Sequence, residues 1–313
     1  MAQLLAFEST TVGDVEETWR RFVPSAKLHR VDPRTFVFSW TSYAMPDFSV
    51  VRYDLAASVQ SAIDPEDQIM ACRVESRGGW VGTPRRDLSA GMPWLAVDGP
   101  TSARWGGSAQ VRAFVFDRAA ADRAARQAIG DERFSLRIDT TEPSPRSRDL
   151  AEQWERVFQH VDRSLQATAA HPDAALIDAE LRRHALHATL LAFSPAFAAA
   201  TERAVQRRAA PRTVRRAIAY IEGHVREPIT IDDVAEAAGI STRGLQYAFR
   251  RALGVTPTQY LRTERLAGAH AELADGMPVS EVARRWGFGS PSRFAQHYRA
   301  AYGRRPSETA RGA

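Results

Sequence analysis

Residues 231–240 read IDDVAEAAGI, and residues 279–288 read VSEVARRWGF. Each stretch has the pattern of a short helix with a small residue at its centre, Ala235 in the first and Ala283 in the second. A small side chain lets a second helix cross closely, and Gly239 and Gly287 supply the tight turn between the two helices. The repeat therefore predicts two helix-turn-helix units.

The second helix of each unit is bounded by matching residues. Ser241 and Ser290 precede it as N-caps, and Gly254 and Gly303 follow it. Pro291 suits the first helical position of the second copy. The apolar positions recur at helical spacing and are expected to form the core of the two units: Val234, Ala235, Ile240, Leu245, Phe249 and Leu253, then Val282, Ala283, Phe288, Phe294, Tyr298 and Tyr302.

A longer helix is predicted between the two units. Thr256 can cap it, Pro257 fits its first turn and Gly276 closes it. At about 1.5 Å per residue this helix is on the order of 30 Å long. One turn of B-DNA is roughly 34 Å, so a rigid helix of this size would place two recognition helices in successive major grooves. The alternative interpretation is a plain helical bundle.

The positive charge lies mainly in the last third of the chain. The net charge is +5, and the residues from Pro211 onward hold 16 arginines, no lysine and 10 acidic residues. The preceding residues therefore carry one net negative charge. A basic domain beside a nearly neutral one is typical of proteins in which one domain binds nucleic acid. An arginine-rich genome is the alternative explanation, since Lys27 is the only lysine.

Residues 212–311 resemble the DNA-binding domain of the AraC/XylS family of transcription regulators. The resemblance rests on the Ala-x-x-x-Gly turn of each unit and on the Gly-x-x-Pro that follows each second helix. It implies a regulator that binds double-stranded DNA, activates transcription together with RNA polymerase and forms a homodimer. For the N-terminal part it implies a ligand-sensing, cupin-like domain.

Base contacts are expected from the solvent face near the start of each recognition helix. This selects Arg243, Gly244, Gln246 and Tyr247 in the first unit and Ser292, Arg293, Gln296 and His297 in the second. Arginine can bind guanine through two hydrogen bonds, and glutamine can do the same with adenine. The arginines expected to contact phosphates are Arg250, Arg251, Arg262, Arg299, Arg304 and Arg305.

A length of 313 residues favours two domains rather than one core. No run approaches the roughly 18 apolar residues of a membrane-spanning helix, and no secretory signal is visible, so a cytoplasmic location is expected. The single cysteine, Cys72, excludes an intrachain disulfide and a zinc site with several cysteines. A buried structural thiol is expected there.

Short strands are predicted up to about Asp117. Phe36, Phe38 and Trp40 alternate with less apolar neighbours, and several similar runs favour an antiparallel sandwich or barrel. A helix is predicted from the Asp117 N-cap to Gly130.

Two helices with apolar faces are predicted over residues 148–193. They could pack on the strand domain or on the same helices of a second subunit, and we expect dimerisation. The predicted fold is α+β, with an N-terminal antiparallel, cupin-like domain and an all-α C-terminal domain. The predicted boundaries are 1–193 for the sensing and dimerisation domain, 194–210 for a linker and 211–313 for the DNA-binding domain.

Aromatic side chains and two arginines mark a candidate effector pocket in the first domain: Phe36, Phe38, Trp40, Arg52, Arg73 and Trp80. Such a mixture suits a small organic effector, either aromatic or a carboxylate. His29 is the only histidine before His160, so neither a metal site nor a cofactor is expected. Two alternatives remain: an enzyme that the C-terminal module tethers to DNA, and a regulator switched by a protein partner.

Overall fold

The structure is a computed structural model. It describes residues 2–25, 27–29, 31–32, 34–76, 79–83, 86–88, 91–97, 99–132, 134–138, 143–168 and 171–311. The outermost residues of the predicted domains, Met1, Gly312 and Ala313, lie outside this range. The chain divides into two compact units, Met1–Ala200 and Thr201–Ala313. The division falls within the predicted linker, where the chain forms helix α5 (Pro195–Ala209).

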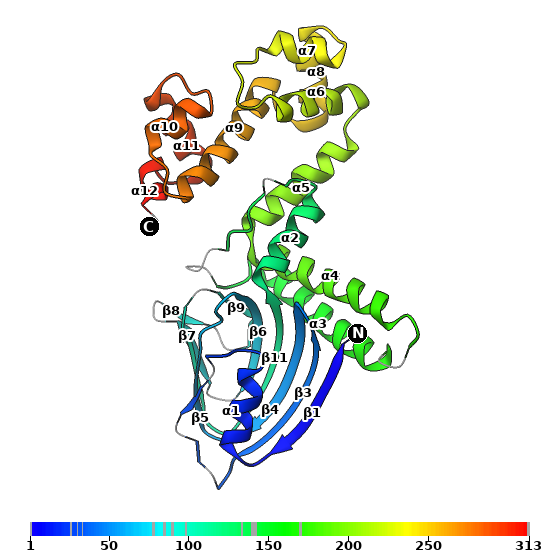
Figure 1. Cartoon of the computed structure of the whole chain (residues 1–313), viewed down its shortest axis with the longest axis vertical. Coiled ribbons are helices and arrows are strands. Elements are labelled where there is room, and N and C mark those ends of the chain that lie inside the picture. The colour runs from blue at the N-terminus through cyan, green and yellow to red at the C-terminus, as the bar shows by residue number, and fades with distance from the viewer. Residues whose placement is uncertain are drawn as a thin grey trace. The chain divides into compact units, whose positions relative to one another are not determined.

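Within the described residues, the N-terminal unit contains two antiparallel sheets (Figure 1). The six-stranded sheet has the order β1-β3-β4-β11-β6-β9, and the five-stranded sheet has the order β2-β5-β10-β7-β8. This confirms the predicted antiparallel β domain. The strands are β1 (Gln3–Ser9), β2 (Lys27–His29), β3 (Val37–Met45), β4 (Phe48–Ala56), β5 (Val59–Ile63), β6 (Gln68–Ser76), β7 (Trp80–Thr83), β8 (Arg86–Leu88), β9 (Trp94–Ala96), β10 (Thr101–Trp105) and β11 (Ser108–Asp117).

The core of this unit lies between the two sheets. Side chains alternate between the faces of a strand, so Val51 and Cys72 of the six-stranded sheet enter this core together with Val81 and Trp105 of the other sheet. Helix α1 (Val12–Arg20) contributes the buried Trp19 to the same cluster.

Helices cover the opposite face of the six-stranded sheet. They are α3 (Arg148–Thr168) and α4 (Ala174–Phe193), whereas α2 (Arg118–Ile129) directly follows β11 and contacts α4. The Phe114 ring of β11 lies 5.3 Å from Trp154 and 4.9 Å from Phe158, both on α3. The Trp154 indole donates to the Thr189 hydroxyl of α4 at 3.0 Å, which joins the two helices. The apolar face of α3, one of the two helices on which the expectation of dimerisation rested, therefore packs against its own sheet.

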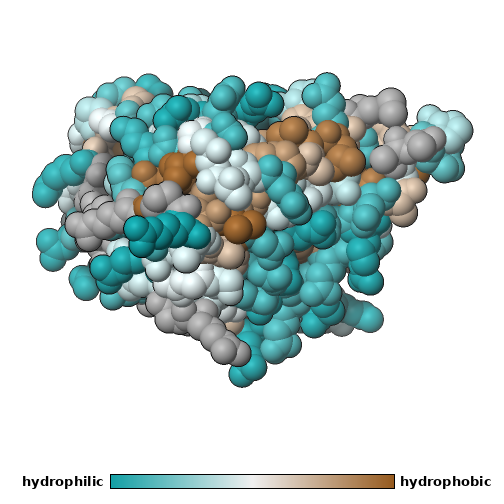
Figure 2. All heavy atoms as spheres, turned by 90° about the horizontal axis from the view of Figure 1, so that it is seen from below, coloured by the Kyte–Doolittle hydropathy of each residue, from teal (hydrophilic) through white to brown (hydrophobic). Residues whose placement is uncertain are grey.

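The surface of this unit exposes few large apolar side chains. Seen from below, the face in Figure 2 is mostly hydrophilic, with hydrophobic groups gathered in patches. Among the described residues of the N-terminal unit, the large hydrophobic side chains that are more than half exposed are Leu4, Val37 and Leu176. No helix in the described part of the chain has the length and apolar character needed to cross a bilayer.

The C-terminal unit is helical and contains the predicted repeat. Its described helices after α5 are α6 (Arg212–Gly223), α7 (Ile231–Ala238), α8 (Thr242–Leu253), α9 (Pro257–Ala274), α10 (Val279–Arg285), α11 (Pro291–Tyr302) and α12 (Pro306–Ala310). Gly239 and Gly287 adopt φ of 71° and 73°, the left-handed conformation that the two turns require. Ser241 and Ser290 cap α8 and α11 as predicted. The two helix-turn-helix units are thereby confirmed.

Candidate nucleic-acid interface and interior cavity

The recognition helices α8 and α11 each have one face in the core and one in solvent. Leu245 and Phe249 of α8 are buried, as are Phe294 and Tyr298 of α11. The residues predicted to contact bases lie on the remaining surface. Arg243, Gln246, Tyr247, Ser292, Arg293 and Gln296 are exposed, whereas Gly244 and His297 are partly buried.

Local hydrogen bonds fix the start of α8. The Ser241 hydroxyl accepts from the Gly244 backbone N–H at 3.1 Å. The Thr242 hydroxyl donates to Asp232 of α7 at 2.5 Å and so ties the recognition helix to the helix before it. On α7, the backbone N–H and the hydroxyl of Thr230 hydrogen-bond the Asp233 carboxylate and lower its pKa. The exposed side chains of α8 therefore project from a firmly capped helix.

Buried polar contacts fix α11. The Tyr298 hydroxyl donates to the Thr309 hydroxyl of α12 at 2.8 Å and lies 2.5 Å from Nδ1 of His270 on α9. The His270 ring also stacks on Tyr302, with ring centres 4.2 Å apart. Burial raises the pKa of Tyr302 to about 12, so this hydroxyl is neutral at physiological pH. These contacts fix how α11 sits against α9 and α12.

The candidate contacts on α11 fall into two grooves. One groove, beside α9, is lined by Arg262, Arg293 and His297 together with Thr258 and Gly289. Sequence reasoning overlooked the last two. The Ser290 N-cap could have indicated Gly289, since backbone groups at a helix start commonly meet phosphate.

The second groove lies towards α12 and brings Gln296 together with Arg299 and Arg305. Of the four residues predicted on α11, Arg293 and His297 line the first groove, Gln296 lines the second, and Ser292 is exposed outside both.

The arginines predicted to contact phosphate lie at the surface of the C-terminal unit. Arg250, Arg251, Arg299, Arg304 and Arg305 are exposed, and Arg262 is partly buried. None of the six forms an ion pair with another described residue. Their guanidinium groups are available to neutralise phosphates.

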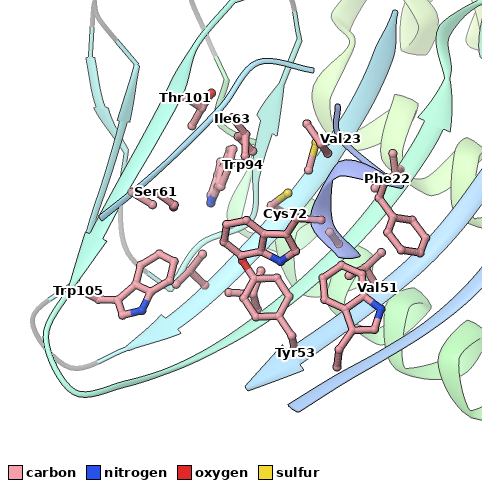
Figure 3. Close-up of a pocket in the computed structure, with 18 residues that line it drawn as sticks. Phe22, Val23, Val51, Tyr53, Ser61, Ile63, Cys72, Trp94, Thr101 and Trp105 are labelled. Carbon is pink, nitrogen blue, oxygen red and sulfur yellow. The ribbon is translucent and has the colours of Figure 1, made fainter. Parts of the chain in front are cut away.

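The N-terminal unit has a cavity between its sheets (Figure 3). The space within it that a water-sized molecule can reach is about 60 Å³. Of the six residues predicted for the effector pocket, only Trp40 is among its described lining residues. Phe36 and Phe38 are buried in the surrounding core. The Trp80 indole donates to Asp87 at 2.7 Å in an exposed position.

The expectation that Arg52 and Arg73 face this pocket is corrected by the structure. Strand register places Arg112 of β11 beside both of them, and all three lie on the face covered by α3. Arg52 forms an ion pair with Asp162 of α3 at 2.8 Å. Glu155 of α3 pairs with Arg73 at 3.0 Å and with Arg112 at 2.6 Å. The three guanidinium groups hold α3 to the sheet, and none of the described residues that line the cavity is a cation.

Replacing Glu155 by alanine is expected to lower the free energy of unfolding by about 2 kcal/mol, because Arg73 and Arg112 would lose the more buried of their two shared carboxylate partners and keep only Glu75. Glu152 is the matched control. It lies on the same helix with its side chain 54% exposed and pairs with Arg148 one turn away. Glu152→Ala should change stability by less than about 0.5 kcal/mol. Urea denaturation followed by circular dichroism makes the measurement, and equal losses in the two variants would contradict the assignment.

Comparison with known proteins supports the C-terminal assignment. Residues 234–312 match a family model described as a helix-turn-helix domain. The probable thc operon regulatory protein of Rhodococcus erythropolis is 40% identical over 107 residues, which cover 33% of this chain and 32% of that protein. The XylDLEGF operon transcriptional activator 3 of Pseudomonas putida is 35% identical over 100 residues, or 31% of this chain and 30% of that protein. The chain thus spans about a third of the length of these curated relatives.

A solved structure is also similar in sequence to part of this chain. The crystal structure of a probable AraC family transcriptional regulator from Rhodopseudomonas palustris is 38% identical in the aligned part. The match covers 32% of this chain and 96% of that chain, with a TM-score of 0.32.

Within the described residues, no group of three or more His, Cys, Asp and Glu side chains is arranged to hold a metal ion.

Proposed function

We propose that this chain is a transcription regulator of the AraC/XylS family, whose C-terminal unit reads two adjacent DNA half-sites while its N-terminal unit binds a small organic effector. The observation that carries the proposal is the repeated construction of α8 and α11. Both are 12-residue helices capped by serine at the start and by left-handed glycine at the end, and both present an arginine near the start to solvent.

Helix α9 supports the use of both units on one duplex. It contacts α8 and α11, and its 18 residues correspond to about 27 Å, close to the roughly 34 Å of one turn of B-DNA. In this arrangement Arg243 and Arg293 contact base edges, and the exposed arginines around them contact phosphates.

Three finer parts of the function are proposals of the same kind. The interior cavity supports a small-molecule effector that changes transcription. The Pseudomonas relative carries the name of a transcriptional activator, which favours activation together with RNA polymerase. The 68% exposed Leu176 on α4 favours a homodimer formed through the outer side of that helix rather than through α3.

Two arginine variants of the full chain test the assignment of DNA contacts. Arg243→Ala should relax base preference at one position, with a loss of about 1–3 kcal/mol in discrimination against the wrong base. Arg304→Ala should weaken binding to all sequences alike and reduce the slope of log K against log salt by about 1. Footprinting identifies the operator, and salt-dependent titrations on matched and mismatched duplexes measure both effects. The same response from both variants would refute the division into base and phosphate contacts.

A further inference from the structure

The interior cavity is lined by aromatic and aliphatic groups without a charged side chain. Eighteen described residues line it, and none of them is Asp, Glu, Lys, Arg or His. Large rings come from α1 and from both sheets, so aromatic surface surrounds the space on several sides. The ring-bearing lining residues are Trp19, Phe22, Trp40, Tyr53, Trp94 and Trp105.

The ionisable groups among these residues are neutral at physiological pH. Burial raises the pKa of the Cys72 thiol to about 12, and burial also raises the pKa of the Tyr53 hydroxyl. The nearby guanidinium groups of Arg52 and Arg73 lie on the opposite face of the sheet, where α3 supplies their carboxylate partners. A carboxylate placed in this cavity would lose its hydration without gaining a counter-ion, which is strongly unfavourable.

Two hydrogen-bond donors in the cavity have no acceptor. The indole Nε1 groups of Trp94 and Trp105 are buried and have no hydrogen-bond partner within the described protein. The two residues are only 5% and 3% exposed. By contrast, the Trp40 indole in the same cavity donates to the Ser42 hydroxyl at 2.8 Å. Buried N–H groups are normally paired, so these two donors indicate a binding partner that brings an acceptor.

The two donors belong to different sheets. Trp94 lies on β9 of the six-stranded sheet, and Trp105 lies on β10 of the five-stranded sheet. Figure 3 shows their rings on the walls of the space between the sheets, with Cys72 and Tyr53 also directed into it. The hydroxyls of Ser61 and Thr101 add polar groups on the side of the five-stranded sheet.

We propose that the effector is an uncharged aromatic compound carrying a hydrogen-bond acceptor, such as a ketone, amide or nitrile, that accepts from the indole N–H groups of Trp94 and Trp105. The inference rests on the proposed function in one respect, since it takes this cavity as the effector site. An aromatic cavity can also hold an organic cation over its rings. Two unpaired N–H donors in the lining disfavour a cation, because a cation offers them no hydrogen-bond acceptor.

Four compounds of similar size and different charge test this ligand class. Acetophenone supplies a neutral acceptor, ethylbenzene lacks the acceptor, benzoate is an anion and phenyltrimethylammonium is a cation. Calorimetric titration of the full chain should give acetophenone the lowest Kd, about threefold to tenfold below that of ethylbenzene, which is the fold-change expected for one net hydrogen bond. The Kd values for benzoate and phenyltrimethylammonium should be higher by at least roughly tenfold.

Indole-to-phenyl substitutions test the two donors directly. Trp94→Phe and Trp105→Phe should each weaken acetophenone binding by about threefold to tenfold and leave ethylbenzene binding nearly unchanged. Trp80→Phe is the matched control, because it removes an indole N–H that bonds Asp87 outside the lining, and it should alter neither Kd. Equal weakening of both ligands would mean that the indoles contribute packing only and would overturn the assigned role.

The possible failures separate this inference from the proposed function. Preferential binding of benzoate or of phenyltrimethylammonium would overturn the ligand class and leave effector binding intact. Absence of binding by all four compounds would overturn the inference together with the effector part of the function. The DNA-binding part is tested independently by Arg243→Ala and Arg304→Ala.

Discussion

Replacement of Gly268 by alanine is expected to destabilise the C-terminal unit by about 2–4 kcal/mol and to weaken DNA binding. Gly268 lies in α9, and a Cβ added there would stand 1.8 Å from Cη2 of Trp286. The Trp286 ring is 3% exposed, and the Arg226 guanidinium lies 4.6 Å from its centre. The ring cannot make room without leaving this packed position, and its displacement would loosen α10, the first helix of the second unit.

Gly223→Ala provides the control for this substitution. Gly223 ends α6 in the same unit, and its added Cβ would meet nothing within 4 Å, so the change should stay within about 0.5 kcal/mol. Trp286→Leu combined with Gly268→Ala should recover part of the lost stability, because the shorter side chain vacates the space. Urea denaturation followed by circular dichroism gives the free energies. If Gly268→Ala proved as stable as Gly223→Ala, the close packing of Trp286 on α9 would be refuted.

The boundaries of the C-terminal helices could be predicted because their causes are local. A serine hydroxyl bonds a backbone N–H three residues along the chain, and a glycine enters the left-handed region at the helix end. Gly254 and Gly303 both have φ of 70°, as their positions after the two recognition helices require. Such signals lie within a few residues of the boundary that they set.

The contact between Gly268 and Trp286 has no local cause. In the repeat, Trp286 stands where the first copy has Ala238, so the second unit must accommodate a much larger side chain. The space comes from a glycine on another helix, at a position outside the repeated stretches. Sequence matching detects the repeat but not this compensation.

The face of the sheet to which each strand side chain points could be predicted only in part. Alternation requires Arg52 and Tyr53 to point to opposite faces, yet it does not indicate which face encloses the cavity. That choice depends on the five-stranded sheet and on α3, whose carboxylates lie far along the chain. The donors of Trp94 and Trp105 escaped notice for the same reason, since only the assembled sheets show that they lack acceptors.

Binding of the full chain to DNA is expected to depend steeply on the spacing of the two half-sites. A duplex with half-sites one helical turn apart should be bound roughly a hundredfold more tightly than one with a single half-site, because loss of one or two base contacts costs about 1–3 kcal/mol each. Insertion of about half a turn should remove most of that advantage, because the second site then faces away from α11. Electrophoretic mobility shifts on the three duplexes measure the Kd values.

A fourth duplex, in which the half-sites are separated by one additional full turn, brings both sites back to the same face of the DNA. It distinguishes a stiff connection between α8 and α11 from a flexible one. Helix α9 is continuous over 18 residues, and both recognition helices pack against it, so the distance between them should not change with the spacing of the half-sites. The extra turn should therefore fail to restore tight binding, whereas a flexible tether would recover much of the affinity through a high effective concentration. Recovery at the longer spacing would contradict a stiff connection through α9. Affinity indifferent to every spacing would show that only one of the two recognition helices contacts bases.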